Sequence, residues 1–164
     1  MGVFVEVSQT AGGAKIPGDA KFNNHLNWIV CESCTIPTTR PEVQTTMGKV
    51  TDRTRANVDF EDIQLKKSMD LASPLLMEWN LQGTGRFVTI HFTDETDWYL
   101  ELKLTNTILT KLDIDADAEG AATETLSLDF TQIEYAYRSK LPDGSNFDNA
   151  NRRTYDIAEG KITG

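Results

Sequence analysis

The chain has 164 residues, of which 39% are hydrophobic, and it carries a formal net charge of −9. That length is enough for one compact domain with a buried core. Phosphate groups are bound by clusters of lysine and arginine, so the acidic composition argues against binding to nucleic acid and to anionic membrane surfaces. No apolar run approaches the roughly 18 residues of a membrane-spanning helix. The N-terminus lacks a basic segment followed by a long apolar run, so we expect a cytoplasmic protein without a cleaved signal peptide.

The first third of the chain alternates strand patterns with polar loops. Val3, Val5 and Val7 recur at every second position and predict a first strand. Residues 26–36 predict a second strand, which Pro37 ends because proline cannot donate a hydrogen bond to a sheet. Residues 38–55 have almost no apolar periodicity, and an irregular segment of this length in a small domain usually has a function.

One helix signal stands in the middle of the chain. It follows a third strand pattern at 58–67, in which the apolar positions change parity. Ser73 is a candidate N-cap with Pro74 at the first helical position, and Gly83 or Gly85 is suited to the C-terminal end. We expect about two turns. The side chains expected to face the core are Leu75, Leu76, Trp79 and Leu81.

The strongest strand patterns lie in the second half. After a fourth strand at 88–92, residues 98–114 alternate, with even-numbered residues from Trp98 to Leu104 and again Leu112 apolar, which predicts one buried face. Alternation resumes at 126–130 on even positions and moves to odd positions at 133–137. This change predicts a β-bulge near 131–132. Tyr155 and Ile157 indicate a last short strand.

Together these patterns predict a mainly β fold, an antiparallel β-barrel or sandwich with one short α-helix, in a single domain over residues 1–164. Such a sheet either closes on itself or uses its edges to bind another chain. Trp28, Trp79 and Trp98 each lie in an apolar pattern, and we interpret them as core residues.

Two acidic or sulfur-containing patterns resemble metal sites. Cys31 and Cys34 form C-x-x-C, but a zinc site requires four ligands, and residues three apart in a strand point to opposite faces, so we interpret both as structural. A second group falls at positions 1, 3, 5 and 12 of an EF-hand-like loop: Asp113, Asp115, Asp117 and Glu124. Ala118 stands where that loop needs glycine and strands flank it, so a solvated acidic hairpin is favoured. A calcium-dependent β-sandwich binding module stays open as an alternative.

The histidines give little indication of catalysis. His25 and His91 are each alone in the sequence, and His91 is expected on the solvated face of its strand. His25 near Cys31 or Ser33 suggests a nucleophile and a base, but no third orienting residue accompanies them. We therefore predict no enzymatic activity, no cofactor and no metal, with a hydrolase built on His25 as the least favoured alternative.

Three segments together resemble the haemolysin-coregulated protein (Hcp) family of type VI secretion. They are DFEDI at 59–63 with LKK at 65–67 and ASPLL at 72–76, then YLELKLTNT at 99–107, then TETLSLDF at 123–130 with IEYAY at 133–137. The resemblance covers roughly residues 24–138. It implies a β-barrel with one helix that assembles into a homohexameric ring. Rings stack into a tube that a contractile sheath propels outward behind a VgrG-like spike protein, with effectors carried in the lumen. The protein is then secreted. A tail-tube-like protein of another contractile machine is an alternative with the same fold.

The resemblance also implies site residues. The family's second strand faces the lumen, so by matching position Ser33 and Thr35 are expected to contact cargo. The 38–55 loop is expected to reach a neighbouring subunit or the next ring. There Lys49, Arg53 and Arg55 are expected to meet acidic residues from 94–124, since complementary charges set register between subunits.

Overall fold

The computed structural model describes residues 2–10, 12–39 and 59–164. Lys49, Arg53 and Arg55, which were expected to mediate stacking, lie outside the described residues. The elements are β1 (Gly2–Ser8), β2 (Ile29–Cys31), β3 (Ser33–Thr35), β4 (Thr38–Thr39), β5 (Asp59–Phe60), β6 (Ile63–Ser68), α1 (Ser73–Gln82), β7 (Arg86–Thr93), β8 (Trp98–Ala116), β9 (Ala122–Asp129), β10 (Gln132–Tyr137), β11 (Asn151–Asp156) and β12 (Lys161–Thr163).

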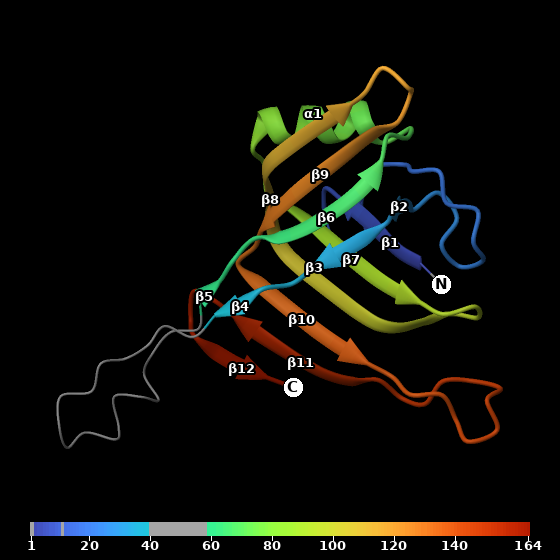
Figure 1. The fold of residues 1–164 in the computed structure, drawn as a ribbon. Coiled ribbons are helices and arrows are strands. Elements are labelled where there is room, and N and C mark those ends of the chain that lie inside the picture. The colour runs from blue at the N-terminus through green and yellow to red at the C-terminus, as the bar shows by residue number, and fades with distance from the viewer. Residues whose placement is uncertain (1, 11, 40–58) are drawn as a thin grey trace.

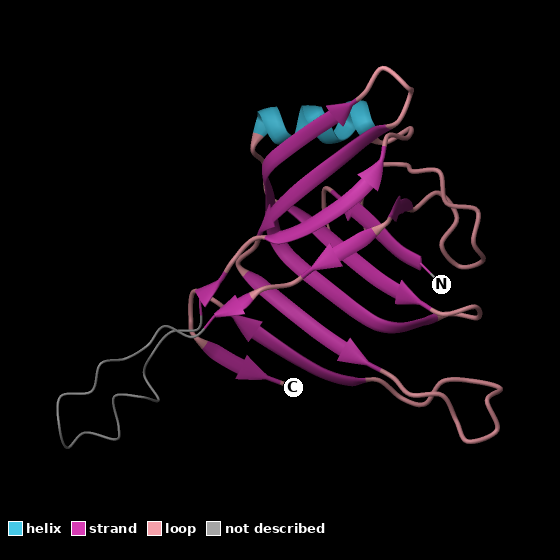
Figure 2. Cartoon of the chain, viewed as in Figure 1, coloured by secondary structure: helices cyan, strands magenta, loops and turns pink. Residues whose placement is uncertain are grey.

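The strands form a coiled antiparallel sheet, and the single helix of the described residues lies against it (Figures 1 and 2). One path runs β12-β11-β10-β8-β7-β1-β2, while β9 joins β8 to β6, and β6 pairs with β3. Only Glu32 separates β2 from β3, and its N–H donates to the Lys66 carbonyl at 2.7 Å. The sheet curls round its core without closing into a continuous barrel. The predicted mainly antiparallel β fold with one helix is confirmed.

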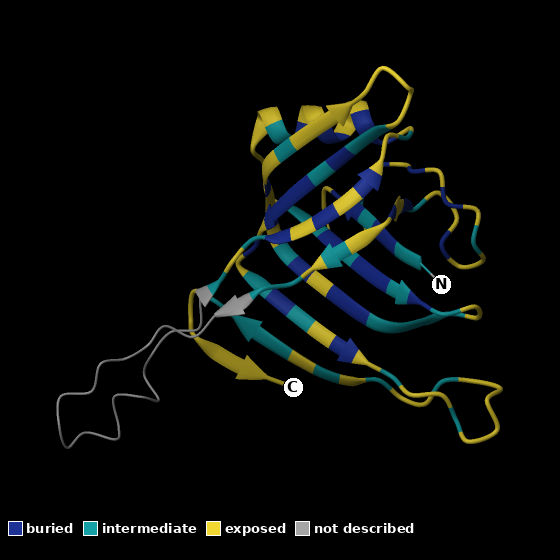
Figure 3. Ribbon diagram, in the orientation of Figure 1, coloured by how far each residue is buried: buried dark blue, intermediate teal, exposed yellow. Residues whose placement is uncertain are grey.

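The core lies on the inner face of the curled sheet, where cross-strand partners share their burial (Figure 3). Val5 on β1 pairs with Ile90 on β7, which pairs with Leu102 on β8, and all three are at most 2% exposed. Burial of one apolar side chain contributes about 1.5–3 kcal/mol, so this face stabilises most of the sheet. The expected strands at β1 and β7 are confirmed.

The long strand β8 reverses its buried face twice. Leu102 and Leu104 face inward, then Thr107 and Leu109 do so, and finally Leu112. Asn106, with a φ of 51°, causes the first reversal, and a register shift between Leu109 and Lys111 causes the second. Leu104 and Leu112 are both even-numbered and both face inward, because the two reversals between them cancel. The sequence pattern therefore does not reveal either reversal.

The irregularity predicted near 131–132 is a break between two strands and not a bulge within one. β9 ends at Asp129 and β10 begins at Gln132. β9 pairs with the second half of β8, whereas β10 pairs with its first half. The parity changes because the chain passes from one half of the sheet to the other.

Helix α1 is one turn longer than expected and begins differently. The residue before it is Ala72, and the Ser73 hydroxyl makes no capping bond, so the N-cap prediction is wrong. Instead, the Asp70 carboxylate accepts from the Ala72 N–H at 3.0 Å. Leu76 and Trp79 are buried as predicted, but Leu75 and Leu81 are exposed, Leu81 by 79%. Of the two glycines predicted to end the helix, Gly83 does so in the left-handed region, with a φ of 66°.

The second predicted strand is shorter than 26–36, because Leu26 lies in a loop and Glu32 interrupts the ladder. That interruption turns Cys34 towards the same core as Cys31, so the prediction of opposite faces is wrong. The C-terminal strand at Tyr155 is confirmed as β11, and β12 was missed. No helix in the described ranges is long and apolar enough to span a membrane.

Candidate functional site

Strand β3 presents a polar surface together with β6. Ser33 and Thr35 are exposed, and they pair with Lys66 and Gln64, which are exposed as well. Direct cross-strand partners share a face, so two hydroxyls, an amide and an ammonium group lie side by side. This surface suits reversible polar contacts. It includes Ser33 and Thr35, which the family resemblance predicted to contact cargo.

A second polar arrangement is buried beneath the N-terminal loop. The loop places His25 over β7, with His25 Nε2 2.8 Å from His91 Nδ1. His91 Nε2 lies 2.6 Å from Glu101 Oε2, and Arg152 donates to Glu101 Oε1 at 2.6 Å. The side chains run in order from β7 to β8 to β11. The predictions that each histidine is alone and that His91 is solvated are wrong, since His25 is 1% and His91 7% exposed.

The charges in this network are set by its hydrogen bonds. Burial by itself raises the pKa of Glu101, but hydrogen bonds from His91 and Arg152 outweigh it and lower the pKa to about 2. Burial lowers the pKa of His25, which favours its neutral form. A neutral His25 that donates from Nδ1 to the Asn23 carbonyl, at 3.2 Å, accepts at Nε2 from His91.

Aromatic rings enclose the two imidazoles. His25 lies 5.0 Å from Phe4 and 4.8 Å from Trp28, measured between ring centroids, and His91 lies 5.1 Å from Trp98. The Arg138 guanidinium stacks on Trp98, 3.7 Å from the ring centroid. The network therefore fastens the N-terminal loop to the sheet.

The histidines and cysteines do not form a nucleophile and base pair. His25 bonds to His91, and burial raises the pKa of the Cys31 thiol to about 12, so the thiol stays protonated. Burial likewise raises the pKa of Cys34 to about 12. Both cysteines are free and pack in or against the core, which fits the structural role predicted for them.

A third polar cluster lies beneath α1. Lys67 is 0% exposed and contacts Glu124 Oε2 at 2.6 Å and Asp70 Oδ1 at 2.9 Å. Ser73 donates to the same Glu124 oxygen at 3.0 Å. Burial by itself lowers the pKa of Lys67, but hydrogen bonds to Glu124 and Asp70 outweigh it and raise the pKa, so Lys67 remains charged.

This cluster removes Glu124 from the EF-hand-like pattern. Asp113 and Asp115 are exposed along β8, while Glu124 is 1% exposed and bound to Lys67. The calcium-dependent alternative therefore loses its twelfth-position ligand. Within the described parts of the chain, no three His, Cys, Asp or Glu side chains gather in a way that could hold a metal ion.

Sequence reasoning missed these buried clusters for different reasons. His91 and Glu101 lie on the two strands of one hairpin, β7 and β8. Their distance from the turn between these strands would have predicted that they pair. Lys67 shares the odd-numbered, buried positions of β6 with Ile63 and Leu65, and this alternation in the sequence indicated that its side chain is buried. His25 had none, because it comes from an irregular loop whose path depends on tertiary contacts.

Comparison with known proteins agrees with the fold. No curated protein matches the chain. A structure of a type six secretion system protein superposes with a TM-score of 0.82 at 12% identity, covering 98% of this chain and 99% of that one. A type VI secretion system effector from Yersinia pestis gives 0.71 at 19% identity, covering 94% and 99%. Hcp1 from Salmonella typhimurium gives 0.69 at 19% identity, covering 99% and 100%.

The sequence gives a more specific assignment than the structural likeness, which at these identities supports the fold. The family model described as "Type VI secretion system effector, Hcp" matches residues 4–137. The match runs from β1 to the end of β10 and so includes the β3–β6 surface, the Lys67 cluster and, of the histidine network, His25, His91 and Glu101 but not Arg152. The chain belongs to the Hcp family of the type VI secretion system.

Proposed function

We propose that this chain, as a single domain over residues 1–164, is a non-enzymatic structural subunit of the type VI secretion inner tube. Homohexameric rings stack into a tube that carries effectors in its lumen, with a contractile sheath and a VgrG-like spike protein as partners. The subunit is made in the cytoplasm and leaves the cell with the tube. The family match over residues 4–137 is the observation that carries this proposal, and it favours type VI secretion over another contractile machine.

Open sheet edges support assembly. All three residues of β12 are exposed, and this strand ends one path of the sheet. Beside it lies a groove of about 650 Å³, lined mainly by apolar side chains: Ile36, Phe60, Ile133, Tyr135, Tyr155 and Ile162. An unpaired edge next to an apolar groove is a favourable contact surface for a neighbouring subunit. A head-to-tail contact closes into a ring when its rotation allows.

The polar β3–β6 surface supports the role proposed for the lumen. Ser33 and Thr35 would contact cargo there, with Gln64 and Lys66 beside them. Short hydroxyl side chains bind weakly, which suits a protein that must release what it carries.

Charge complementarity supports the stacking role proposed for Lys49, Arg53 and Arg55. Among the acids from 94–124, Asp94 is already paired with Lys140 at 2.9 Å and Asp97 with Arg138 at 2.8 Å, and Glu101 and Glu124 are bound to Arg152 and Lys67. The exposed acids of the β8–β9 hairpin are therefore better candidates to meet a neighbouring loop.

Light scattering behind size-exclusion chromatography, with negative-stain images of the same peak, tests the proposal. We expect a mass six times that of one chain and open rings. Charge reversal at Arg53 and Arg55 is expected to weaken stacking and leave single rings intact. A chain that stays monomeric at high concentration contradicts ring assembly, and stacking that survives the reversal contradicts the role of the loop.

A further inference from the structure

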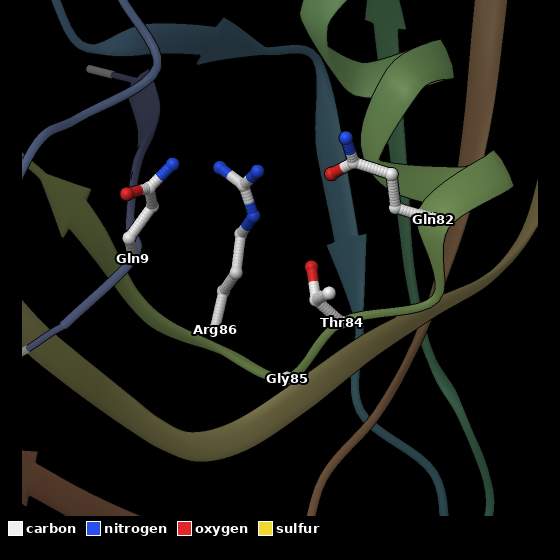
Figure 4. A pocket seen from close by; sticks show the side chains of 5 residues that line it. All are labelled: Gln9, Gln82, Thr84, Gly85 and Arg86. Atoms are coloured by element: carbon white, nitrogen blue, oxygen red, sulfur yellow. The ribbon is translucent and has the colours of Figure 1, made fainter.

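A small polar pocket lies where the α1–β7 connection meets the end of β1 (Figure 4). Its volume is about 220 Å³, and its lining residues are Gln9, Gln82, Thr84, Gly85 and Arg86. Arg86 is the only charged residue among them, and its guanidinium extends between Gln9 and Gln82 in Figure 4. The space is smaller than the 300–1,000 Å³ of a typical small-molecule site, so it fits a group the size of one side chain.

The backbone holds this pocket in a fixed shape. Trp79 Nε1 donates to the Thr84 carbonyl at 2.7 Å, just after the left-handed Gly83. A Cβ on Gly85 would lie 1.9 Å from Asn106 Oδ1, so a larger residue there would require the Asn106 side chain to move. Arg86 pairs with Thr107 on β8, directly before a register shift that separates it from the regular ladder beginning at Val88. Arg86 is therefore placed by local geometry and needs little ordering to bind a partner.

The hydrogen-bonding capacity of Arg86 is unmet within the described residues. Its Nε is buried without a hydrogen-bond partner, and no described carboxylate forms an ion pair with it. Its guanidinium carbon lies 5.7 Å from the Trp79 ring centroid, so the aromatic ring lies beneath the charge. A guanidinium presents its donors in a planar fork that matches a carboxylate, and the neighbouring amides and hydroxyl are additional donors. The chemistry of the pocket selects a carboxylate.

The β8–β9 hairpin carries a carboxylate of suitable shape. Glu119 is exposed at the turn, between Ala118 and Gly120, so the turn is narrow. The Glu119 N–H donates to Asp117 Oδ1 at 3.0 Å, which fixes the turn and leaves the Glu119 side chain outside. The turn lies at the far end of β8 from the pocket of its own chain. Arg86 pairs with Thr107, and nine further residues of β8 lead to Ala116, roughly 30 Å at about 3.3 Å per residue.

We propose that the Arg86 pocket receives the Glu119 carboxylate from a second copy of this chain. Pocket and hairpin lie at different places on the subunit, so the contact is head-to-tail and can repeat from copy to copy. The inference rests on the self-assembly stated under the proposed function, and it names one contact of that assembly. Arg86 and Glu119 set which copies fit together, as complementary charges do at other interfaces.

A charge swap tests the contact. Wild type, Arg86→Glu, Glu119→Arg and the double variant are compared by sedimentation velocity over a range of concentrations. Each single variant is expected to raise the concentration for half-assembly at least 10-fold, and the double variant to recover most of that loss. An equimolar mixture of the two single variants is also expected to assemble, because an alternating arrangement pairs every pocket with an opposite charge. Asp143→Arg, a charge reversal at another exposed turn residue, is expected to assemble as wild type.

Each outcome decides between the two proposals. Single variants that assemble as wild type, or a double variant and a mixture that recover nothing, overturn the Arg86–Glu119 contact and leave the ring proposal standing. A wild-type chain that stays monomeric overturns ring assembly and the contact with it. Arg86→Gln and Glu119→Gln provide milder changes, and melting curves confirm that each variant is folded. A folded Arg86→Gln with unchanged assembly also overturns the contact.

Discussion

The two buried charge clusters differ in how they meet solvent. The histidine network runs from His25, at 1% exposure, to Arg152, whose side chain is 38% exposed, so its charge extends to the surface. The Lys67 cluster is sealed beneath α1, with side-chain exposures of 0% for Lys67, 1% for Glu124 and 8% for Asp70. It also keeps two carboxylate oxygens without hydrogen-bond partners among the described residues, Asp70 Oδ2 and Glu124 Oε1.

This difference determines how each cluster tolerates change. A charge near water is stabilised by solvent when its partner is removed, whereas a sealed charge is left in a medium of low polarity. The Lys67 cluster should therefore respond to mutation as a unit. The histidine network should respond gradually and mainly to pH.

The largest expected effect comes from opening the sealed cluster. Lys67→Met leaves Glu124 buried without its cation and is expected to lower the free energy of unfolding by about 3–5 kcal/mol. Replacing Glu124 with Met in addition is expected to recover part of this loss, because it removes the unpaired charge. Urea unfolding at neutral pH measures both.

Lys111→Met is the matched control. Its side chain is 66% exposed and pairs with Asp113 at 3.3 Å, so a loss below about 1 kcal/mol is expected. A Lys67→Met variant as stable as this control would mean that the sealed cluster is not held together by its charges.

The next largest effect is expected at Glu101. Its pKa in the folded protein, about 2, lies below its ordinary value of 4.5, so its stabilising effect is complete above pH 4.5 and is lost as the pH falls towards 2. Glu101→Gln is expected to lower the free energy of unfolding by about 2–3 kcal/mol at pH 7 and to match wild type near pH 2. Urea unfolding between these values measures the convergence. Glu95→Gln, at an exposed position, is the control, and a constant difference across the range would contradict the prediction.

The smallest effect is expected at His25. Burial lowers its folded pKa below 6.5, so it contributes stability above pH 6.5 and loses it as the pH falls through the lowered value. Between pH 8 and pH 5.5 wild type is expected to lose more of its free energy of unfolding than His25→Gln. Unfolding midpoints in urea at the two pH values give the comparison. An equal loss in both proteins would show that His25 does not sense pH.

The sequence predicted the parts of the fold that depend on regular alternation, such as β1, β7 and the start of β8. The prediction of which side chains are buried failed where a single residue departs from regular strand geometry. Asn106 and Glu32 each change which face is buried, and neither change is visible in apolar periodicity.

The candidate sites were predicted only in part, for a related reason. The family resemblance indicated Ser33 and Thr35 by matching position, and both side chains are exposed, while their contact with cargo stays a prediction. The histidine network and the Arg86 pocket bring together residues from three elements or more, and local patterns carry no information on such contacts.

The 19-residue strand β8 has a mechanical consequence. It is hydrogen-bonded to β7 and β10 along its first half and to β9 along its second. Hydrogen bonds of an antiparallel sheet run perpendicular to the strands, so a force along β8 loads many of them at the same moment. A force that lifts β12, which is bonded on one side by three residue pairs, breaks its bonds one after another. Under tension the subunit would yield at its C-terminal edge long before its central strand moves.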